Sequence, residues 1–365
     1  MSDRSSVWTD LHSRLHRTLK VRSLLPPGQP VLMAISGGQD SLCLGKLLLD
    51  LREKWDWQLA IAHCDHRWQG DEGNAEFVQA IAASWQIPYY PVTALAPIPP
   101  TEAAARTWRY QQLTKLAQQQ GFSIVVTGHT ASDRAETLLY NLVRGSGADG
   151  LQALTWQRAL APGIHLSRPL LTVTRRETAE FCQSIGLTAW DDIHNQNLQY
   201  ARNRIRQELI PYLQAHLNPQ VESALAQTAE LLHAEVTYLE SEAQRVYQQV
   251  VWQGEGDEGG KTDEESKTTR TPSLSSLSSL SSLPAPTPHL GLNRRLLRTQ
   301  PLALQRRVMR MALQSVLPVA PQFDHIEKLV ALLTAPNRSQ TDPFPGGTIA
   351  HVAEDWIWLQ ALASG

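Results

Sequence analysis

The feature that most constrains the fold is an apolar run, a glycine turn and a helical pattern, in that order near the N-terminus. Residues 31–35 are Val-Leu-Met-Ala-Ile, residues 36–41 are Ser-Gly-Gly-Gln-Asp-Ser, and a helical pattern begins at Leu42. Glycines allow backbone N–H groups to close around an anion, and the dipole of the following helix attracts negative charge. The order therefore predicts a strand, a phosphate-binding loop and a helix. An ordinary glycine turn of an α/β fold is the competing interpretation.

The loop differs from a Walker loop, which needs Gly-Lys-Ser/Thr at its end. Asp40 stands where the lysine would be, and the nearest lysine is Lys46, one turn into the helix. A carboxylate next to polyphosphate makes sense when a divalent cation lies between them. We therefore expect a polyphosphate ligand in this loop and a divalent cation on Asp40. The loop residues expected to bind the phosphates are Ser36, Gly37, Gly38, Gln39, Asp40 and Ser41.

Short apolar runs alternate with longer helical patterns from Val31 to about Leu213. Strands are predicted at 31–35, 59–64, 89–92 and 124–127, with a fifth near 165–166. Helices are predicted between them at 42–53, 72–85, 102–119, 132–143 and 175–185. This alternation indicates a Rossmann-like, doubly wound α/β domain whose mainly parallel sheet is covered on both faces. Ligands bind such sheets at the carboxyl ends of the strands.

The rest of the chain predicts a smaller, mainly helical C-terminal domain. We place the first domain at 1–215 and a long helix at 216–252. An acid-rich run and a Ser/Leu repeat at 253–288 are low in complexity and typical of a disordered linker. The small appended domain then covers 289–365, with helical patterns at 293–313 and 323–333 and a β unit at 348–362.

Composition excludes several classes of protein. The formal net charge is only -2, so no global basic field indicates a nucleic-acid partner. The three cysteines, Cys43, Cys64 and Cys182, are far apart and provide neither a disulfide framework nor a four-sulfur metal site. No run of eighteen apolar residues indicates a membrane span, and the N-terminus lacks the apolar segment of a secretory signal. We expect a cytoplasmic enzyme.

The segment after the fourth predicted strand carries two acids on one helical face. Asp133 and Glu136 are three residues apart near the start of a predicted helix. At the carboxyl edge of a sheet they could hold Mg²⁺, receive an ammonium group or act as a base. The alternative is that the helix dipole favours acids at this end. His129, which precedes them, is by itself more often structural than catalytic.

Two further segments carry candidate ligands of a nucleotide. Arg106 and Arg109 are three residues apart on one helix face, and a guanidinium group suits phosphate or carboxylate. A solvated surface pair is the alternative. The run from His63 to Arg67 resembles a metal cluster, but its ligands are packed too tightly for most zinc sites. We expect it to contact the nucleotide instead.

Basic residues gather locally although the whole chain is near neutral. The segment 266–323 contains no acid, and binding of a phosphate backbone needs such a local excess. A solvated helix face is the alternative. The arginines expected to contact nucleic acid are Arg202, Arg204 and Arg206, and, further along, Arg306, Arg307 and Arg310.

The loop at 36–41 resembles that of the PP-loop (N-type) ATP pyrophosphatases, which cleave ATP to AMP and pyrophosphate. Within that superfamily, further motifs over about residues 30–213 resemble the tRNA(Ile)-lysidine synthetase family in order and spacing, and 301–311 is similar to its appended domain. The motifs are His63-x-x-His66, Glu102-Ala103-Ala104-Ala105-Arg106-x-x-Arg109-Tyr110, Gly128-His129-x-x-x-Asp133-x-x-Glu136-Thr137, Arg144-Gly145-Ser146-Gly147, Arg168-Pro169-Leu170-Leu171, Asp191-x-x-x-Asn195 and Arg202-Asn203-Arg204-Ile205-Arg206.

The chain departs from the pattern of that family at several positions. His129-Thr130 stands where the family often has His-His, Ser132-Asp133-Arg134 where it has Asp-Asp-Gln, and Arg67-Trp68 where Gly-Leu-Arg is common. Asp133 and Glu136 are nevertheless in place. We also expect the second appended domain of longer members to be absent.

The resemblance implies a ligase that uses ATP and Mg²⁺. The C2 oxygen of the wobble cytidine of a CAU-anticodon tRNA(Ile) is adenylated with release of pyrophosphate, and the ε-amine of L-lysine then displaces AMP to form lysidine. A homodimer is one option for the assembly. The implied roles are catalysis by Asp40, Asp133, Glu136, Arg106 and Arg109, ATP binding by the loop with His63 and His129, and tRNA binding by the six arginines named above.

Three other functions compete with this one. tRNA thiolation uses the same scaffold but relies on paired or motif-placed cysteines, which this chain lacks. Amidating relatives such as NAD, GMP or asparagine synthetases need an ammonia source, and no glutaminase domain precedes the loop. A module that only binds ATP would not need the acid pair after the fourth strand. AMP release that depends on both lysine and tRNA would separate all three.

Overall fold

The computed structural model describes residues 8–191, 197–252 and 290–361, in two compact units at Met1–Val236 and Thr237–Gly365. The low-complexity segment expected at 253–288 lies outside the described residues. Helix α10 (Val221–Val250) contributes its first part to one unit and its last part to the other. No helix of the described residues is long and apolar enough to cross a bilayer.

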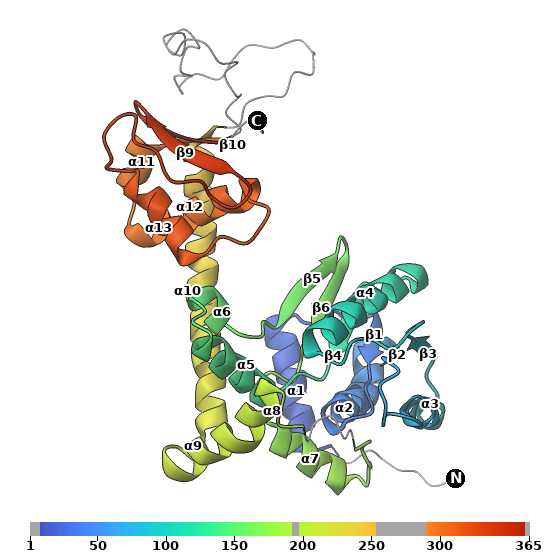
Figure 1. Ribbon diagram of the computed structural model, residues 1–365. Coiled ribbons are helices and arrows are strands. Elements are labelled where there is room, and N and C mark those ends of the chain that lie inside the picture. Colours follow the sequence, from blue (N-terminus) through green and yellow to red (C-terminus); the bar gives the residue numbers. More distant parts are fainter. Residues whose placement is uncertain (1–7, 192–196, 253–289, 362–365) are drawn as a thin grey trace. The chain divides into compact units, whose positions relative to one another are not determined.

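The first unit is built on a six-stranded sheet (Figure 1). The strands run in the order β3-β2-β1-β4-β6-β5, and every neighbouring pair is parallel except β5 with β6. This confirms the predicted doubly wound, mainly parallel α/β fold. The antiparallel strand β5 was not predicted. The strands are β1 (Pro30–Ala34), β2 (Gln58–Asp65), β3 (Tyr89–Thr93), β4 (Ile124–Thr127), β5 (Gln157–Ala161) and β6 (Ile164–Ser167).

Helices cover both faces of this sheet because its strands are apolar on both sides. In β1, Val31 and Met33 belong to the core formed with α1, α2, α3 and α7, whereas Leu32 belongs to the core formed with α4. The helices are α1 (Asp10–Arg22), α2 (Gln39–Trp55), α3 (Asn74–Trp85), α4 (Glu102–Gln120), α5 (Ala131–Val143), α6 (Ala148–Leu151), α7 (Arg175–Ser184), α8 (Ala201–Arg204), a π-helical turn (Ile205–Leu209) and α9 (Ile210–His216).

The second unit packs helices on a small antiparallel sheet in the order β7-β8-β10-β9. One helix was predicted at 293–313, but two form, because Pro301 has no N–H for a helix interior and starts the second helix instead. The predicted β unit is the hairpin of β9 and β10. The elements are β7 (Val251–Trp252), β8 (Leu290–Asn293), α11 (Arg294–Arg298), α12 (Leu302–Val316), α13 (Phe323–Ala331), β9 (Thr348–Ala353) and β10 (Trp356–Ala361).

Candidate active site

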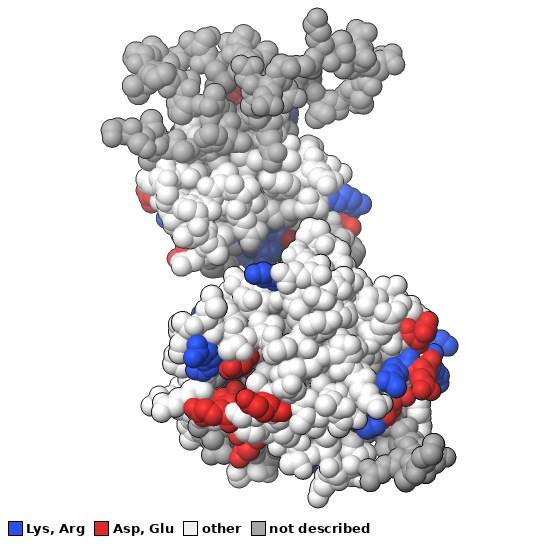
Figure 2. All heavy atoms as spheres, turned by 90° about the vertical axis from the view of Figure 1, so that its right-hand side faces the viewer, with Lys and Arg blue, Asp and Glu red and all other residues white. Residues whose placement is uncertain are grey.

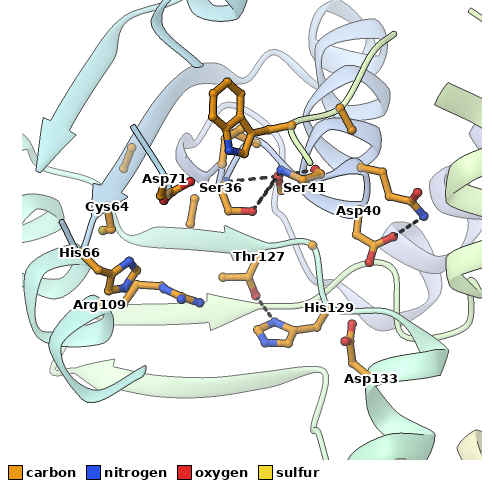
Figure 3. A pocket seen from close by; sticks show the side chains of 18 of the residues that line it. Ser36, Asp40, Ser41, Cys64, His66, Asp71, Arg109, Thr127, His129 and Asp133 are labelled. Atoms are coloured by element: carbon orange, nitrogen blue, oxygen red, sulfur yellow. Dashed lines mark hydrogen bonds between the residues drawn. The ribbon is translucent and has the colours of Figure 1, made fainter. Parts of the chain in front are cut away.

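A cavity of about 690 Å³ opens at the carboxyl ends of β1, β2 and β4 (Figure 3). Strand β1 lies between β2 and β4, at the point where the sheet order reverses, which is the usual ligand position in such folds. The loops after β1 and β4 meet there, and a Cβ at Gly128 would lie 2.8 Å from the backbone of Asp40 and Ser41. Only glycine permits this approach. The volume is typical of a small-molecule site.

The glycine loop forms one wall of the cavity. Gly37 adopts φ +88°, and α2 begins at Gln39 directly after the loop. Ser41 Oγ donates to Gly38 O at 2.8 Å and accepts from Ser36 N at 3.2 Å, which closes the loop on itself. The first N–H groups of a helix have no intrahelical acceptor and are available to an anion. Ser36, Gly38, Gln39, Asp40 and Ser41 all line the cavity.

Two neighbours hold this loop from outside. Asn74 Nδ2, at the start of α3, donates to Ser36 O at 3.0 Å. The Trp190 N–H donates to Gly37 O at 3.0 Å, and a Cβ at Gly37 would lie 3.2 Å from Trp190 Cβ. Gly37 is therefore enclosed on both sides. Its positive φ also disfavours any residue with a side chain.

Three carboxylates meet one guanidinium group at the other end of the cavity. Arg175, the first residue of α7, donates from Nε to Asp40 Oδ2 at 3.2 Å, from Nη1 to Glu136 Oε1 at 2.8 Å and from Nη2 to Asp133 Oδ1 at 2.8 Å. Asp40 belongs to α2 and the other two acids to α5. The predicted catalytic acids thus lie together. Arg175 was not predicted, although it follows the quoted motif 168–171 by only four residues.

The ion cluster sets the charge of these acids. Burial would raise the pKa of Asp133, but Arg175, His129 and hydrogen bonds from Thr130 outweigh it and lower that pKa to about 2. For Asp40, burial prevails over the attraction of Arg175, and its pKa is raised above the ordinary value. Asp133 is therefore ionised at neutral pH.

Arg206 joins the same cluster, although it was predicted to contact tRNA. Its Nε donates to Glu136 Oε1 at 2.8 Å and its Nη2 to Glu136 Oε2 at 3.0 Å, and it lines the cavity. Arg202 pairs with Glu102 and donates to Thr137 Oγ1 at 3.2 Å. Arg204 is exposed. The three arginines of one short motif therefore have three different surroundings.

Arg109 and His66 lie across the cavity from Asp40 and Asp133, whereas His129 lies next to Asp133 (Figure 3). Burial lowers the pKa of His66 to about 4 and that of His129 to about 3. His63 donates from Nδ1 to Ile35 O at 2.9 Å, and burial lowers its pKa too. Arg109 is therefore the cation of this wall.

The predicted residue Arg106 does not line the cavity. Its guanidinium carbon lies 5.2 Å from the centre of the Tyr110 ring. Tyr110 itself lines the cavity. Of the two predicted arginines of α4, the structure thus brings only Arg109 to the cavity lining.

Cys64 also lines the cavity. Burial raises the pKa of its thiol to about 12, so it stays protonated at neutral pH. Cys43 is buried within α2, and its pKa is raised as well. Cys182 is not among the residues that line the cavity; its Sγ donates to Gln39 O at 3.6 Å, and a hydrogen bond with Cys43 lowers its pKa.

The donor set can be tested for a divalent cation. In the described part of the chain, no three His, Cys, Asp or Glu side chains are arranged to hold a metal on their own. Asp40 accepts from Thr178 at one oxygen and from Arg175 at the other. Mg²⁺ commonly uses one or two carboxylates and completes its shell with phosphate oxygens and water, and the Asp40 carboxylate, which lines the cavity beside the glycine loop, fits that chemistry.

The predicted tRNA-binding arginines of the second unit have acidic partners. Arg306 donates to Glu327 of α13 at 2.7 Å. Arg307 and Arg310 donate to Glu240 of α10 at 2.7 and 2.9 Å. The segment 266–323 has no acid of its own, but neighbouring helices supply them. These arginines are thus less free for phosphate than the local sequence indicates.

Two family models match the chain. One, described as a PP-loop domain, matches residues 9–213, and the other, described as a TilS substrate binding domain, matches residues 292–358. A curated tRNA(Ile)-lysidine synthase of Nostoc is 57% identical over 97% of this chain and 98% of that protein. One of Synechocystis is 49% identical over 96% and 98%.

The chain belongs to the tRNA(Ile)-lysidine synthase family. A chloroplastic member of this family from Zygnema circumcarinatum is 35% identical over 89% of this chain and 80% of that protein. The U34-tRNA thiolase NcsA of Methanococcus maripaludis has the same fold, with a TM-score of 0.52 and 15% identity over 61% of this chain and 78% of that one. Family membership confirms the resemblance drawn from the motifs.

Proposed function

We propose that this member of the family attaches L-lysine to C2 of the wobble cytidine of CAU-anticodon tRNA(Ile), using ATP. The observation that carries the proposal is the single cavity in which a glycine loop at a helix N-terminus faces a cluster of three carboxylates. A backbone cradle suits the β- and γ-phosphates of ATP. The acids suit a cationic amine, which is the other substrate of the proposed reaction.

The first step forms a bond between the cytidine C2 oxygen and the α-phosphorus of ATP. The bond between the α-phosphorus and the bridging oxygen breaks, and pyrophosphate leaves with both electrons. Ser36, Gly38, Gln39 and Ser41 line the cavity where the leaving group would be held by backbone N–H groups. Gly37 provides the turn, and the neutral His129, which lines the cavity, suits a contact with an uncharged part of the nucleotide, whereas His63 does not line the cavity and supports the loop through Ile35 O.

Asp40 would hold Mg²⁺ beside the phosphates. The ion, when bound, offsets the negative charge of the triphosphate as the leaving group departs. Arg175 already donates to Asp40 Oδ2, so binding of the ion at that oxygen requires the guanidinium group to release it. Asp133 and Glu136 remain paired with Arg175, and Glu136 also with Arg206, and they keep their place in the cluster.

The second step forms a bond between the lysine Nζ and C2 of the cytidine, and AMP leaves with the C2 oxygen. Lysine must arrive as an ammonium ion and lose a proton before it attacks. We assign the ammonium site to Asp133, which is ionised and faces the cavity, and the positioning of the acids to Glu136, Arg175 and Arg206. Arg109, across the cavity, suits the lysine carboxylate or the α-phosphate.

The tRNA contacts remain proposals. The family match at 292–358 supports a role in substrate binding for the second unit. Within that unit we keep Arg306, Arg307 and Arg310 as tRNA contacts, and in the first unit Arg202 and Arg204. The homodimer and the cytoplasmic location remain predictions.

The thiolation alternative has less support. The likeness to the thiolase concerns the fold, and burial raises the pKa of Cys64, the thiol that lines the cavity. Cys64→Ala should therefore leave activity intact.

Incorporation of labelled L-lysine into an unmodified tRNA(Ile) transcript tests the proposed function. The purified protein should transfer label only when ATP and the transcript are both present. Asp40→Ala and Glu136→Ala should each abolish transfer, by at least about 100-fold, while the affinity for tRNA survives. Loss of tRNA affinity in these variants would mean that the two acids are structural. No transfer by the unaltered protein would refute the proposal.

A further inference from the structure

Four arginines of the first unit surround one tyrosine next to the cavity. The guanidinium carbons of Arg158, on β5, and Arg106, on α4, lie 4.2 and 5.2 Å from the centre of the Tyr110 ring. Arg168, which follows β6, is only 2% exposed and donates to Thr155 O at 2.6 Å. Arg109 precedes Tyr110 in the chain and lines the cavity. We call these four residues and Tyr110 the arginine strip.

The strip lacks counter-ions. None of its four arginines forms an ion pair with a carboxylate among the residues that the structure describes, whereas Arg175 and Arg206 across the cavity pair with three acids. The Nε of Arg168 is buried without a partner in the same described part of the chain. The arginines also lower the pKa of Tyr110, as an uncompensated positive field does. Such a field favours an anion.

The chemistry of the strip favours phosphate. A guanidinium group that stacks on an aromatic ring uses its face, so the N–H groups at its edge remain available for a second partner. Those edges match the oxygens of phosphate in a bidentate way. Arg158 and Arg106 both stack on Tyr110 in this manner, and Arg158 lies on an exposed part of β5.

The strip runs from the cavity to the protein surface. Tyr110 and Arg109 line the cavity, while Arg158 lies outside it on the β5–β6 hairpin, which packs against α4. The phosphates of ATP are expected at the glycine loop, which follows β1. Arg109 lies across the cavity from Asp40, a residue of that loop (Figure 3). One mononucleotide at the loop would leave the outer end of the strip unused. A polymer that enters the cavity with one base would carry further phosphates past it.

We propose that the arginine strip binds backbone phosphates of the tRNA anticodon loop next to the nucleotide that enters the cavity. This inference rests on the proposed function, because it takes an RNA with a base in the cavity as the substrate. It assigns a new role to the β5–β6 hairpin and to Arg158, Arg168 and Tyr110. Acidic and basic side chains lie close together on the face shown in Figure 2, so a few placed arginines, rather than a broad basic field, would guide the RNA.

Arg158→Ala in the full chain tests the inference, since Arg158 is exposed and outside the cavity. Its affinity for the tRNA(Ile) transcript, measured by fluorescence anisotropy at several salt concentrations, should fall about 3- to 10-fold, and the slope of log affinity against log salt should flatten by about 1. The KM for ATP should not change. Arg158→Lys, which keeps the charge, should restore most of the salt slope.

Arg176→Ala is the matched control. Arg176 is an exposed arginine of the same unit, paired only weakly with Glu180 at 3.8 Å, and its loss should leave tRNA affinity unchanged. An unchanged affinity and slope in Arg158→Ala would overturn the inference. A raised KM for ATP with normal tRNA binding would also overturn it and assign the strip to the nucleotide. Lysine transfer by the unaltered protein is measured separately, so failure of the proposed function is distinguishable from failure of the strip.

Discussion

Arg175 donates to one oxygen of each of three acids that come from two helices, and this arrangement fixes their geometry. Glu136 is almost fully buried within the cluster, and Arg175 itself is only partly exposed. Removal of a buried partner leaves an uncompensated charge, which costs more than the pair gains. The guanidinium group meets the three carboxylates through three different nitrogens in one plane, whereas a lysine carries all its donors on a single nitrogen.

Replacement of Arg175 should therefore affect both stability and turnover. We expect Arg175→Met to lower the free energy of unfolding by about 3 kcal/mol, because the acids lose their shared partner. Lysine transfer should fall by at least about 100-fold at a temperature where the variant is folded. Urea unfolding and the transfer assay measure the two effects. Arg176→Met, in the next and exposed position, should change stability by less than about 0.5 kcal/mol; equal effects at both positions would contradict the assignment.

The pKa of Asp133 predicts how stability depends on pH. The folded protein lowers this pKa from 3.8 to about 2, so the unfolded chain takes up the proton first as pH falls. The stabilisation is complete above about pH 4 and is lost as pH falls toward 2. Asp133→Asn should reduce the loss of unfolding free energy between pH 5 and pH 2, measured by urea unfolding at each pH. Asp10→Asn, at an exposed position of α1, should lose stability at low pH as the unaltered protein does. If Asp133→Asn also lost stability to the same extent, groups other than Asp133 would be responsible.

Individual residues also show which parts of the site could not be predicted from the sequence. Asp40, Asp133 and Glu136 could be predicted as a group, because each follows a predicted strand whose end lies at one sheet edge. Arg175 could not, because its partners are 39 to 135 residues away in the chain. The acidic partners of the arginines of α12 could not be predicted for the same reason. Acids of other helices reach Arg306, Arg307 and Arg310, and no local pattern carries that information.

At the scale of elements, the loop after β4 determines how closely two parts of the site approach. Gly128 has an ordinary backbone but no space for a side chain, since a Cβ would meet the backbone where α2 begins. We expect Gly128→Ala to displace the start of α2, destabilise the unit by about 1–3 kcal/mol and weaken ATP binding at least about tenfold. Calorimetric titration with a non-hydrolysable ATP analogue and urea unfolding measure these effects.

Gly147→Ala is the control for that change, because a Cβ there would meet nothing within 4 Å. It should bind the analogue normally. Normal binding by Gly128→Ala would show that the close approach of the two loops is not needed for the nucleotide.

The parallel strands and their helices were predictable because each is a continuous apolar run or a helical period of sufficient length. Strand β5 was missed because its residues are largely exposed, as an edge strand allows. Strand β8 was not predicted either, because only four residues, Leu290–Asn293, form it and the predicted helical pattern begins at its last residue.

At the scale of the whole molecule, one cavity combines the glycine loop, the acids paired with Arg175, and Arg109 on the opposite side. The family assignment covers both units, through residues 9–213 and 292–358. The near-neutral net charge of -2 conceals this separation of opposite charges, which is why composition alone gave no indication of an RNA partner. A bipolar cavity suits a reaction that brings an anionic nucleotide and a cationic amine to one base.

The most direct test is mass analysis of the nucleosides of a CAU-anticodon tRNA(Ile) transcript after incubation with the protein, ATP, Mg²⁺ and L-lysine. We predict that the wobble cytidine gains the mass of lysine less one water, that AMP and pyrophosphate appear in equal amounts with it, and that omission of lysine prevents the change. An unmodified wobble cytidine with the complete mixture, or sulfur in place of lysine on the tRNA, would contradict the account.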